Sequence, residues 1–265
     1  MKSRYSKIVR ILLLVAVVVI VVLANVSHRG TAIKEVAVYV DYVGNDTLVT
    51  AAQLRGMVMG KYRDIKNQSV ADVDIEGVRN VVKTNPYVDE AIVSVSVSAE
   101  LMINITQRSP LVRVFTKNTE FYLDNKGRYM PISSVKNQSV IIANGFIKKD
   151  FPGKPKDLDL ETLMATDTMA ANYDIVKVYR LALFINADPK AKDLFDQIYM
   201  NANGDLEMVP KLGDHVVIVG GADNLAEKFE NLFALYEKGF SKVGWDKYSL
   251  VNLKYSDQII CTKKQ

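Results

Sequence analysis

The side chains best suited to catalysis are few in this sequence. It contains two histidines, His28 and His215, and one cysteine, Cys261. A histidine can activate a serine or cysteine nucleophile placed beside it, but no G-x-S-x-G elbow occurs in the chain. We therefore interpret His215 as a structural residue at a strand edge and His28 as an interfacial residue beside the apolar segment described below. Cys261 is interpreted as a half-buried thiol on a strand.

Carboxylates and glycines give no stronger case for a site. Asp188 and Asp193 are the pair that a hydrolase could use, although we favour a solvated loop and helix face for them. A metal site would need carboxylates alone, because neither an EF-hand loop nor an H-E-x-x-H motif is present. Gly220-Gly221 lacks the spacing of a phosphate-binding loop. We predict no catalytic residue, no metal, no cofactor and no small-molecule substrate.

The distribution of charge excludes other classes of protein. Four of the 34 basic residues lie in the first ten positions, at Lys2, Arg4, Lys7 and Arg10, with no acidic residue among them. The remaining chain holds 30 basic and 30 acidic residues and is neutral. A nucleic-acid-binding protein needs a basic face on its folded part, so no nucleic-acid partner is expected. One cysteine in 265 residues excludes a disulfide scaffold.

An apolar segment follows these basic residues. Ile8 to Val26 is interrupted only by Arg10 and Asn25, and its 19 positions would rise about 28 Å as a helix, close to the thickness of a hydrocarbon core. We expect a transmembrane helix here, with residues 1–7 in the cytoplasm because basic flanks stay inside. A cleaved signal peptide ending at Val22-Leu23-Ala24 is the alternative.

The next part of the chain has the pattern of a small α+β module. Alternation over Glu35–Val43 predicts a strand, and two helices follow, capped by Thr50 and Asp74. Period-two alternation then predicts a hairpin with its turn at Ala99-Glu100. The order is β-α-α-β-β. The side chains expected in its core are Val93, Val95, Val97, Ile103 and Ile105 of the hairpin and Val78, Val81 and Val82 of the second helix.

Strands dominate after a break at Arg108-Ser109-Pro110. Asn203-Gly204 marks a hairpin, and Asn224 opens an amphipathic helix. We expect a strand-rich mixed α/β domain. Its predicted strands are Val112–Phe115, Phe121–Leu123, Val140–Ala143, Ile198–Met200, Leu206–Val209, Val216–Val219, Ser249–Tyr255 and Ile259–Thr262, and a further helix is predicted within Leu160–Phe184.

This layout and several short motifs resemble one family. The order of basic N-terminus, apolar segment, small module and strand-rich domain is similar to that of the FtsQ/DivIB bacterial cell-division proteins. The small module resembles a POTRA domain, and the second part resembles the β domain of that family. The motifs are Asn85-Pro86-Tyr87-Val88-Asp89-Glu90-Ala91, Leu101-Met102-Ile103-Asn104-Ile105-Thr106-Gln107-Arg108-Ser109-Pro110, Phe121-Tyr122-Leu123-Asp124-Asn125-Lys126-Gly127 and Val251-Asn252-Leu253-Lys254-Tyr255, with Gly244-Trp245-Asp246-Lys247-Tyr248 most similar to members from the Bacteroidetes.

The resemblance implies a single-pass membrane anchor followed by an α+β fold. It also implies a non-enzymatic divisome scaffold that keeps its span in the bacterial inner membrane. Its N-terminus would be cytoplasmic and its bulk periplasmic, as in a type II protein at the septum. FtsB-like and FtsL-like coiled-coil membrane proteins and other divisome proteins are the implied partners. The expected divisions are a tail over 1–7, a span over 8–26, a linker over 27–32, a POTRA-like domain over 33–108 and a β domain over 109–265.

The last strand is the candidate binding site. Ile259–Lys263 has one neighbouring strand in the sequence, so we expect it at a sheet edge with one row of N–H and C=O groups unpaired. A loop could cover this edge, but the resemblance favours addition of a strand from the FtsB-like partner. The residues predicted to bind that partner are Leu250, Asn252, Lys254, Tyr255, Ile259, Ile260 and Thr262.

Two alternative functions remain open at this point. One is a membrane-tethered periplasmic hydrolase that uses Asp188 and Asp193 as paired carboxylates. The other is a POTRA protein of secretion or outer-membrane assembly. Such proteins carry a long transmembrane barrel, for which this chain has too few residues after its small module.

Overall fold

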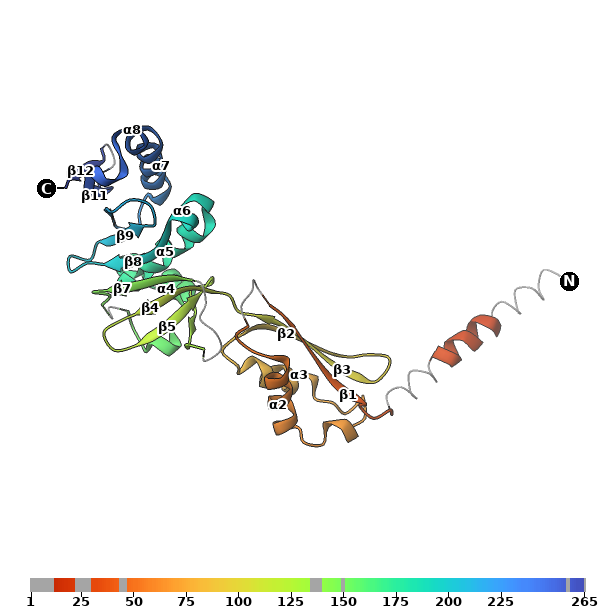
Figure 1. The fold of residues 1–265 in the computed structure, drawn as a ribbon. Coiled ribbons are helices and arrows are strands. Elements are labelled where there is room, and N and C mark those ends of the chain that lie inside the picture. The colour runs from red at the N-terminus through yellow and green to blue at the C-terminus, as the bar shows by residue number, and fades with distance from the viewer. Residues whose placement is uncertain are drawn as a thin grey trace, which may run out of the picture. The chain divides into compact units, whose positions relative to one another are not determined.

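The computed structural model describes residues 12–21, 30–42, 47–133, 140–148, 151–255 and 258–264. The chain divides into two compact units, Met1–Arg108 and Ser109–Gln265. Each has a hydrophobic core of its own. Figure 1 shows the fold of these units.

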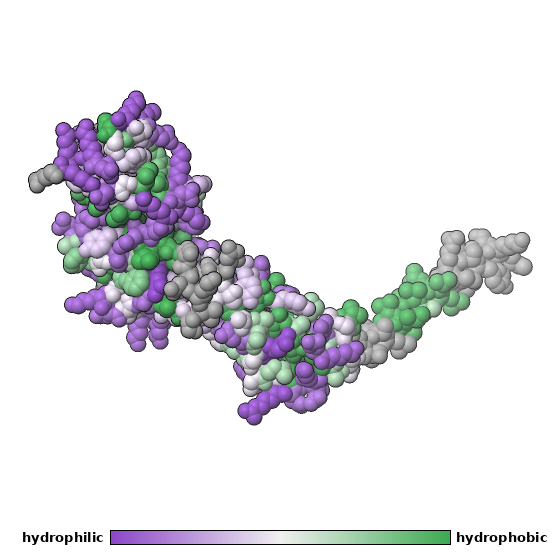
Figure 2. Space-filling model, viewed as in Figure 1, coloured by the Kyte–Doolittle hydropathy of each residue, from purple (hydrophilic) through white to green (hydrophobic). Residues whose placement is uncertain are grey.

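The expected transmembrane helix is not found. Residues 12–21 are helical, and Figure 2 shows them as hydrophobic. Within the described parts of the chain, no helix combines the length and the apolar character needed to cross a membrane. The prediction of a single-pass anchor over 8–26 is therefore wrong; its flanks at 8–11 and 22–26, like the tail 1–7, lie outside the described residues.

The first unit is a mixed sheet with helices on one side (Figure 1). The strand order is β1-β3-β2, in which β3 runs parallel to β1 and antiparallel to β2. The sequence predicts the same order of elements along the chain. Their bounds are β1 Glu35–Asp41, α2 Ala51–Lys61, η1 Ile65–Asn67, α3 Ile75–Lys83, β2 Val88–Val95 and β3 Glu100–Gln107.

Local hydrogen bonds explain where the two helices of this unit begin. The Gln53 N–H donates to Thr50 Oγ1 at 3.2 Å, and the Thr50 N–H donates to Gln53 Oε1 at 2.9 Å. This reciprocal pair is a capping box. The Gly77 N–H donates to Asp74 Oδ1 at 2.8 Å. Both predicted N-caps are confirmed.

The hairpin of β2 and β3 confirms most of the predicted core. Val93, Ile103 and Ile105 are buried, but Val97 is 92% exposed. The reason is the turn, which spans Ser96–Ala99 and is closed by an N–H···O bond of 2.9 Å from Ser96 to Glu100. Val97 lies at its tip, so the alternation that makes Val93 face inward ends before Val97 is reached. The predicted turn at Ala99-Glu100 is therefore wrong, because the turn lies earlier, over Ser96–Ala99.

In the second unit the described strands form one sheet, in the order β12-β11-β10-β9-β8-β7-β4-β5-β6. The strands are β4 Pro110–Phe115, β5 Glu120–Asp124, β6 Tyr129–Met130, β7 Ile141–Gly145, β8 Phe195–Met200, β9 Leu206–Pro210, β10 Val216–Gly220, β11 Tyr248–Asn252 and β12 Ile260–Lys263. The helical segments are η2 Pro155–Asp157, α4 Leu160–Thr166, η3 Ala170–Asn172, α5 Asp174–Ala187, α6 Pro189–Leu194, α7 Leu225–Leu235, the π-helical turn η4 Tyr236–Phe240, α8 Ser241–Val243 and η5 Trp245–Lys247.

The direction of the strands in this sheet sets where its loops gather. β4, β7 and β8 run parallel to one another, so their carboxyl ends lie at the same side of the sheet. β10 and β11 are also parallel, and α7 makes the crossover between them. Residues of α5 and α7 share one core cluster with alternate residues of the strands. The sheet therefore packs helices on one face and leaves several side chains of the other face exposed.

Candidate partner-binding edge

The last strand lies at the edge of the second sheet, as predicted. β12 pairs antiparallel with β11, with Leu250 opposite Thr262, Val251 opposite Cys261 and Asn252 opposite Ile260. Among the described strands, none pairs with the other side of β12. Figure 1 shows these two strands beside α7 and α8 near the C-terminus.

The register decides which main-chain groups of β12 are available to a partner. The Lys264 N–H donates to Lys247 O at 3.1 Å, so Lys264 faces β11. Main-chain groups alternate between the two sides of an antiparallel strand. Ile260 and Thr262 therefore also face β11, whereas the N–H and C=O groups of Cys261 and Lys263 point outward.

The side chains of this strand pair divide between two faces. Val251 and Cys261 lie opposite each other on the face that packs against the core. Ile260 is 42% exposed on the other face, where Thr262 is exposed and Leu250 and Asn252 are half-buried. Four predicted residues, Leu250, Asn252, Ile260 and Thr262, thus form one surface, which we call the open face.

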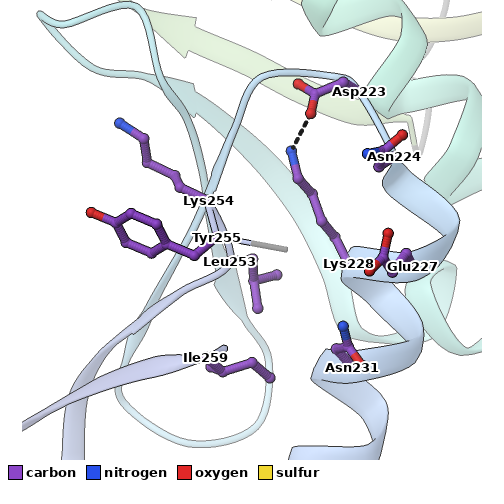
Figure 3. A pocket seen from close by; sticks show the side chains of 9 residues that line it. All are labelled: Asp223, Asn224, Glu227, Lys228, Asn231, Leu253, Lys254, Tyr255 and Ile259. Atoms are coloured by element: carbon purple, nitrogen blue, oxygen red, sulfur yellow. Dashed lines mark hydrogen bonds and ion pairs between the residues drawn. The ribbon is translucent and has the colours of Figure 1, made fainter. Parts of the chain in front are cut away.

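The remaining predicted residues lie near the carboxyl end of β11. Lys254, Tyr255 and Ile259 line a hollow of about 210 Å³. Figure 3 shows Lys228 reaching from α7 toward Asp223 across from Lys254 and Tyr255. The further residues that line the hollow are Asn224, Glu227, Asn231 and Leu253.

Both lysines that line this hollow form ion pairs. Lys254 Nζ lies 2.8 Å from Asp205 Oδ2, and this hydrogen bond raises the pKa of Lys254. Lys228 Nζ donates to Gly221 O at 3.0 Å and lies 3.3 Å from Asp223 Oδ2. The walls are therefore polar and fixed, while Tyr255 remains exposed beside them.

Sequence reasoning missed the α7 side of the hollow. Asp223, Lys228 and Asn231 lie more than twenty residues before Lys254. They reach it because the parallel β10–α7–β11 crossover returns the chain to the same end of the sheet. A strand, an amphipathic helix and another strand in succession was the pattern that could have indicated this crossover.

The residues considered for catalysis are buried or half-buried in the core, cap a helix or lie exposed on one. His215 is buried, its Nε2 lies 2.7 Å from the Tyr236 hydroxyl, and burial lowers the pKa of the imidazole. Burial also raises the pKa of the Cys261 thiol. The Asp188 carboxylate accepts the Ala191 N–H at 2.9 Å and so caps α6, while Asp193 is exposed on that helix. In the described parts of the chain, no group of three or more potential metal ligands occurs.

The second unit matches a known family. The sequence model described as FtsQ/DivIB, C-terminal related, covers residues 109–262, which is more than half of the chain. The chain belongs to this family. The resemblance to FtsQ/DivIB proteins seen in the sequence is thereby confirmed. No curated protein matches the sequence.

Membership in the FtsQ/DivIB-related family assigns the chain to bacterial cell division. The family is one of non-enzymatic division scaffolds whose members interact with other divisome proteins. The matched region includes β11 and all of β12 except Lys263.

Proposed function

We propose that this protein is a non-enzymatic divisome scaffold that binds an FtsB-like partner through the edge of β12. The observation that carries the proposal is the edge itself, where Cys261 and Lys263 point their main-chain groups away from the sheet. The family match supports a role in division rather than hydrolysis, secretion or outer-membrane assembly. FtsL-like and other divisome proteins would join through this partner or beside it at the septum.

Main-chain pairing would supply affinity. A partner strand laid along β12 would meet the N–H and C=O groups of Cys261 and Lys263. Each such hydrogen bond contributes about 0.5–1.5 kcal/mol after desolvation. Lys263 also guards this edge against pairing with unrelated strands, as charged residues on edge strands commonly do.

Side chains on either side of the edge would supply specificity. The open face offers the exposed Ile260 next to Leu250 and Thr262, a small apolar and hydroxyl surface. The hollow beside Tyr255 offers the half-exposed Lys254, which is paired with Asp205. A partner strand with alternating apolar and polar side chains would fit these two surfaces.

The POTRA-like first unit would have a role separate from that of the β12 edge. In the resembling family this module takes part in localisation to the septum, and residues 33–108 would do so here. The second unit would then hold the partner at the place where the first unit is localised.

Two proline substitutions test the edge. Cys261→Pro removes an outward N–H and leaves the ladder to β11 intact, so it should weaken partner binding up to about tenfold while the unit stays folded. Ile260→Pro removes an inward N–H and should instead loosen β12 itself. Binding of the purified full chain to the FtsB-like partner, by calorimetry, and the melting temperature measure the two effects separately.

Cys261→Ala is the matched control, because it removes the thiol but keeps the N–H. It should bind the partner nearly as well as the unchanged chain. Full-strength binding by Cys261→Pro, or by a folded chain truncated after Tyr255, would show that the partner binds elsewhere.

A further inference from the structure

A second groove lies in the same unit, at the carboxyl ends of three parallel strands. It is lined by the loops that follow β4, β7 and β8 and measures about 640 Å³. Loops at this end of parallel strands are a recurrent place for binding sites. The sheet order separates it from β12 by β9, β10 and β11. The lining residues are Thr116, Lys117 and Asn118 after β4, Gly145, Phe146, Ile147 and Lys148 at β7, and Ala202 after β8.

The Phe146 side chain is exposed at this groove, although the next residue of its loop is buried. It is 57% exposed, whereas Ile147 is buried. The Phe146 N–H donates to Met200 O at 2.8 Å. Gly145 has φ +99°, and a Cβ there would lie 2.3 Å from the same carbonyl oxygen. Only glycine permits this close approach of the loop to β8, and the approach turns Phe146 outward.

A buried carboxylate fixes the next residue of the loop. Asp174 at the start of α5 is 4% exposed, and its Oδ2 accepts the Lys148 N–H at 3.1 Å. Its other oxygen lies 3.4 Å from Lys177 Nζ. Because a buried carboxylate needs such partners, this bond holds the backbone of Lys148 in one position. The opposite loop is closed by an N–H···O bond of 2.9 Å from Thr116 to Thr119.

The charged residues that line the groove, among those described, are both lysines. Lys117 and Lys148 line it and are exposed, and neither forms an ion pair within the described part of the chain. Among the described lining residues, none is acidic. The nearby Asp174 is turned inward to its own partners. The groove therefore presents an exposed aromatic side chain and two lysines that form no ion pair with the described residues.

We propose that this groove is a second docking surface, which takes an acidic segment of a protein partner with an apolar side chain packed on Phe146. Carboxylates of the segment would pair with Lys117 and Lys148, and the Asn118 side chain would add hydrogen bonds. A pocket for a small molecule encloses its aromatic residues, whereas Phe146 protrudes. Exposed aromatic residues on a fixed backbone are typical anchors of protein interfaces. This site is independent of the strand addition proposed for β12.

Selection from a random peptide library displayed on phage, with the purified full chain as the target, tests this proposal. Selected peptides should combine acidic residues with an aromatic or aliphatic residue. Their affinity, measured by fluorescence anisotropy on synthetic copies, should fall about tenfold or more in Phe146→Ser and in the double variant Lys117→Glu/Lys148→Glu. It should also weaken as salt is added, because the paired charges are at the surface.

Two matched variants control for general effects on the surface. Val209→Ser removes an exposed apolar side chain of β9 at the other end of the strands, and Lys242→Glu reverses an exposed charge on α8. Both should bind the selected peptides unchanged. Peptides without acidic residues, or equal affinity for the groove variants and the unchanged chain, would overturn the proposal. Cys261→Pro should leave this binding intact, which separates the groove from β12.

Discussion

Among single residues, His215 is a histidine whose burial suits a structural role and not a catalytic one. Its ring lies edge-on to Tyr236 and Phe240, at centroid distances of 5.5 and 5.2 Å. Nε2 is bonded to the Tyr236 hydroxyl, while Nδ1 is buried without a hydrogen-bond partner among the described residues. A protonated ring would leave an N–H unsatisfied and a charge in an apolar site. The sequence predicted a structural role for this histidine, but it could not identify the aromatic partners, because they lie more than twenty positions later in the chain.

His215 should make stability depend on pH. Burial lowers the pKa of the ring in the folded protein, against the opposing effect of Asp214 and with a smaller contribution from Lys264. The unfolded chain therefore binds a proton that the folded chain does not, once the pH falls below about 6.5. The free energy of unfolding should decrease between about pH 7.5 and about pH 5.5. Urea unfolding at these two values measures the change.

The variant His215→Gln isolates this effect, because glutamine stays neutral over the same range. Its stability should be lower than that of the unchanged chain at neutral pH, and the difference should shrink on acidification. An equal loss of stability with pH in both proteins would assign the dependence to other groups.

Gln107 shows a second consequence of burial. It is the last residue of β3, and its side chain is buried and accepts the Leu48 N–H at 2.7 Å. A neutral amide satisfies that backbone donor without burying a charge. The Gln107 side chain thus ties the end of β3 to the backbone that precedes α2.

At the scale of elements, short sequence patterns predicted the helix caps and turns that depend on residues close together in the chain. Thr50 and Asp74 cap their helices as expected, because an N-cap needs only residues within three positions. Asn203-Gly204 lies in the loop between β8 and β9, where Gly204 has φ +81°. Val97 was misplaced because alternation cannot show where a strand stops and its turn begins.

Pairing between distant strands could not be read in the same way. The edge position of β12 could be predicted because it has one neighbouring strand in the sequence, β11, with which it pairs. The parallel pairing of β10 with β11, which forms the hollow at Lys254, depends on the crossover through α7. The groove at Phe146 likewise depends on β4, β7 and β8 being parallel. Such arrangements join residues far apart in sequence, and no local spacing records them.

The hairpin of the first unit gives a prediction at this scale. Ile103 is fully buried in β3, opposite Val93 and Val38 on the neighbouring strands. Ile103→Ala should reduce the free energy of unfolding by about 2–5 kcal/mol through lost burial and the cavity it leaves. Ser94→Ala, on the exposed side of β2, should change it by less than about 0.5 kcal/mol. Equal stability of the two variants in urea would show that the strands face the other way.

At the scale of the whole molecule, the two units have separate cores. One cluster joins the sheet β1-β3-β2 to α2 and α3, and the other joins the larger sheet to α5 and α7. No residue belongs to both clusters among those described. The family match lies wholly within the second unit. A division of labour between localisation and partner binding, as proposed above, needs units that can be stable separately.

Separate cores should give the full chain two thermal transitions instead of one, because cooperative unfolding follows a shared core. Ile103→Ala should lower the transition of the first unit by at least about 8 °C and leave the other unchanged. Ile198→Ala, at a fully buried position of β8, should lower only the second, by at least about 4 °C since that unit is larger. Differential scanning calorimetry of the two variants measures both shifts. A single transition that moves with either substitution would mean that the two units unfold together, and binding defects of first-unit variants could then no longer be separated from loss of the β12 edge.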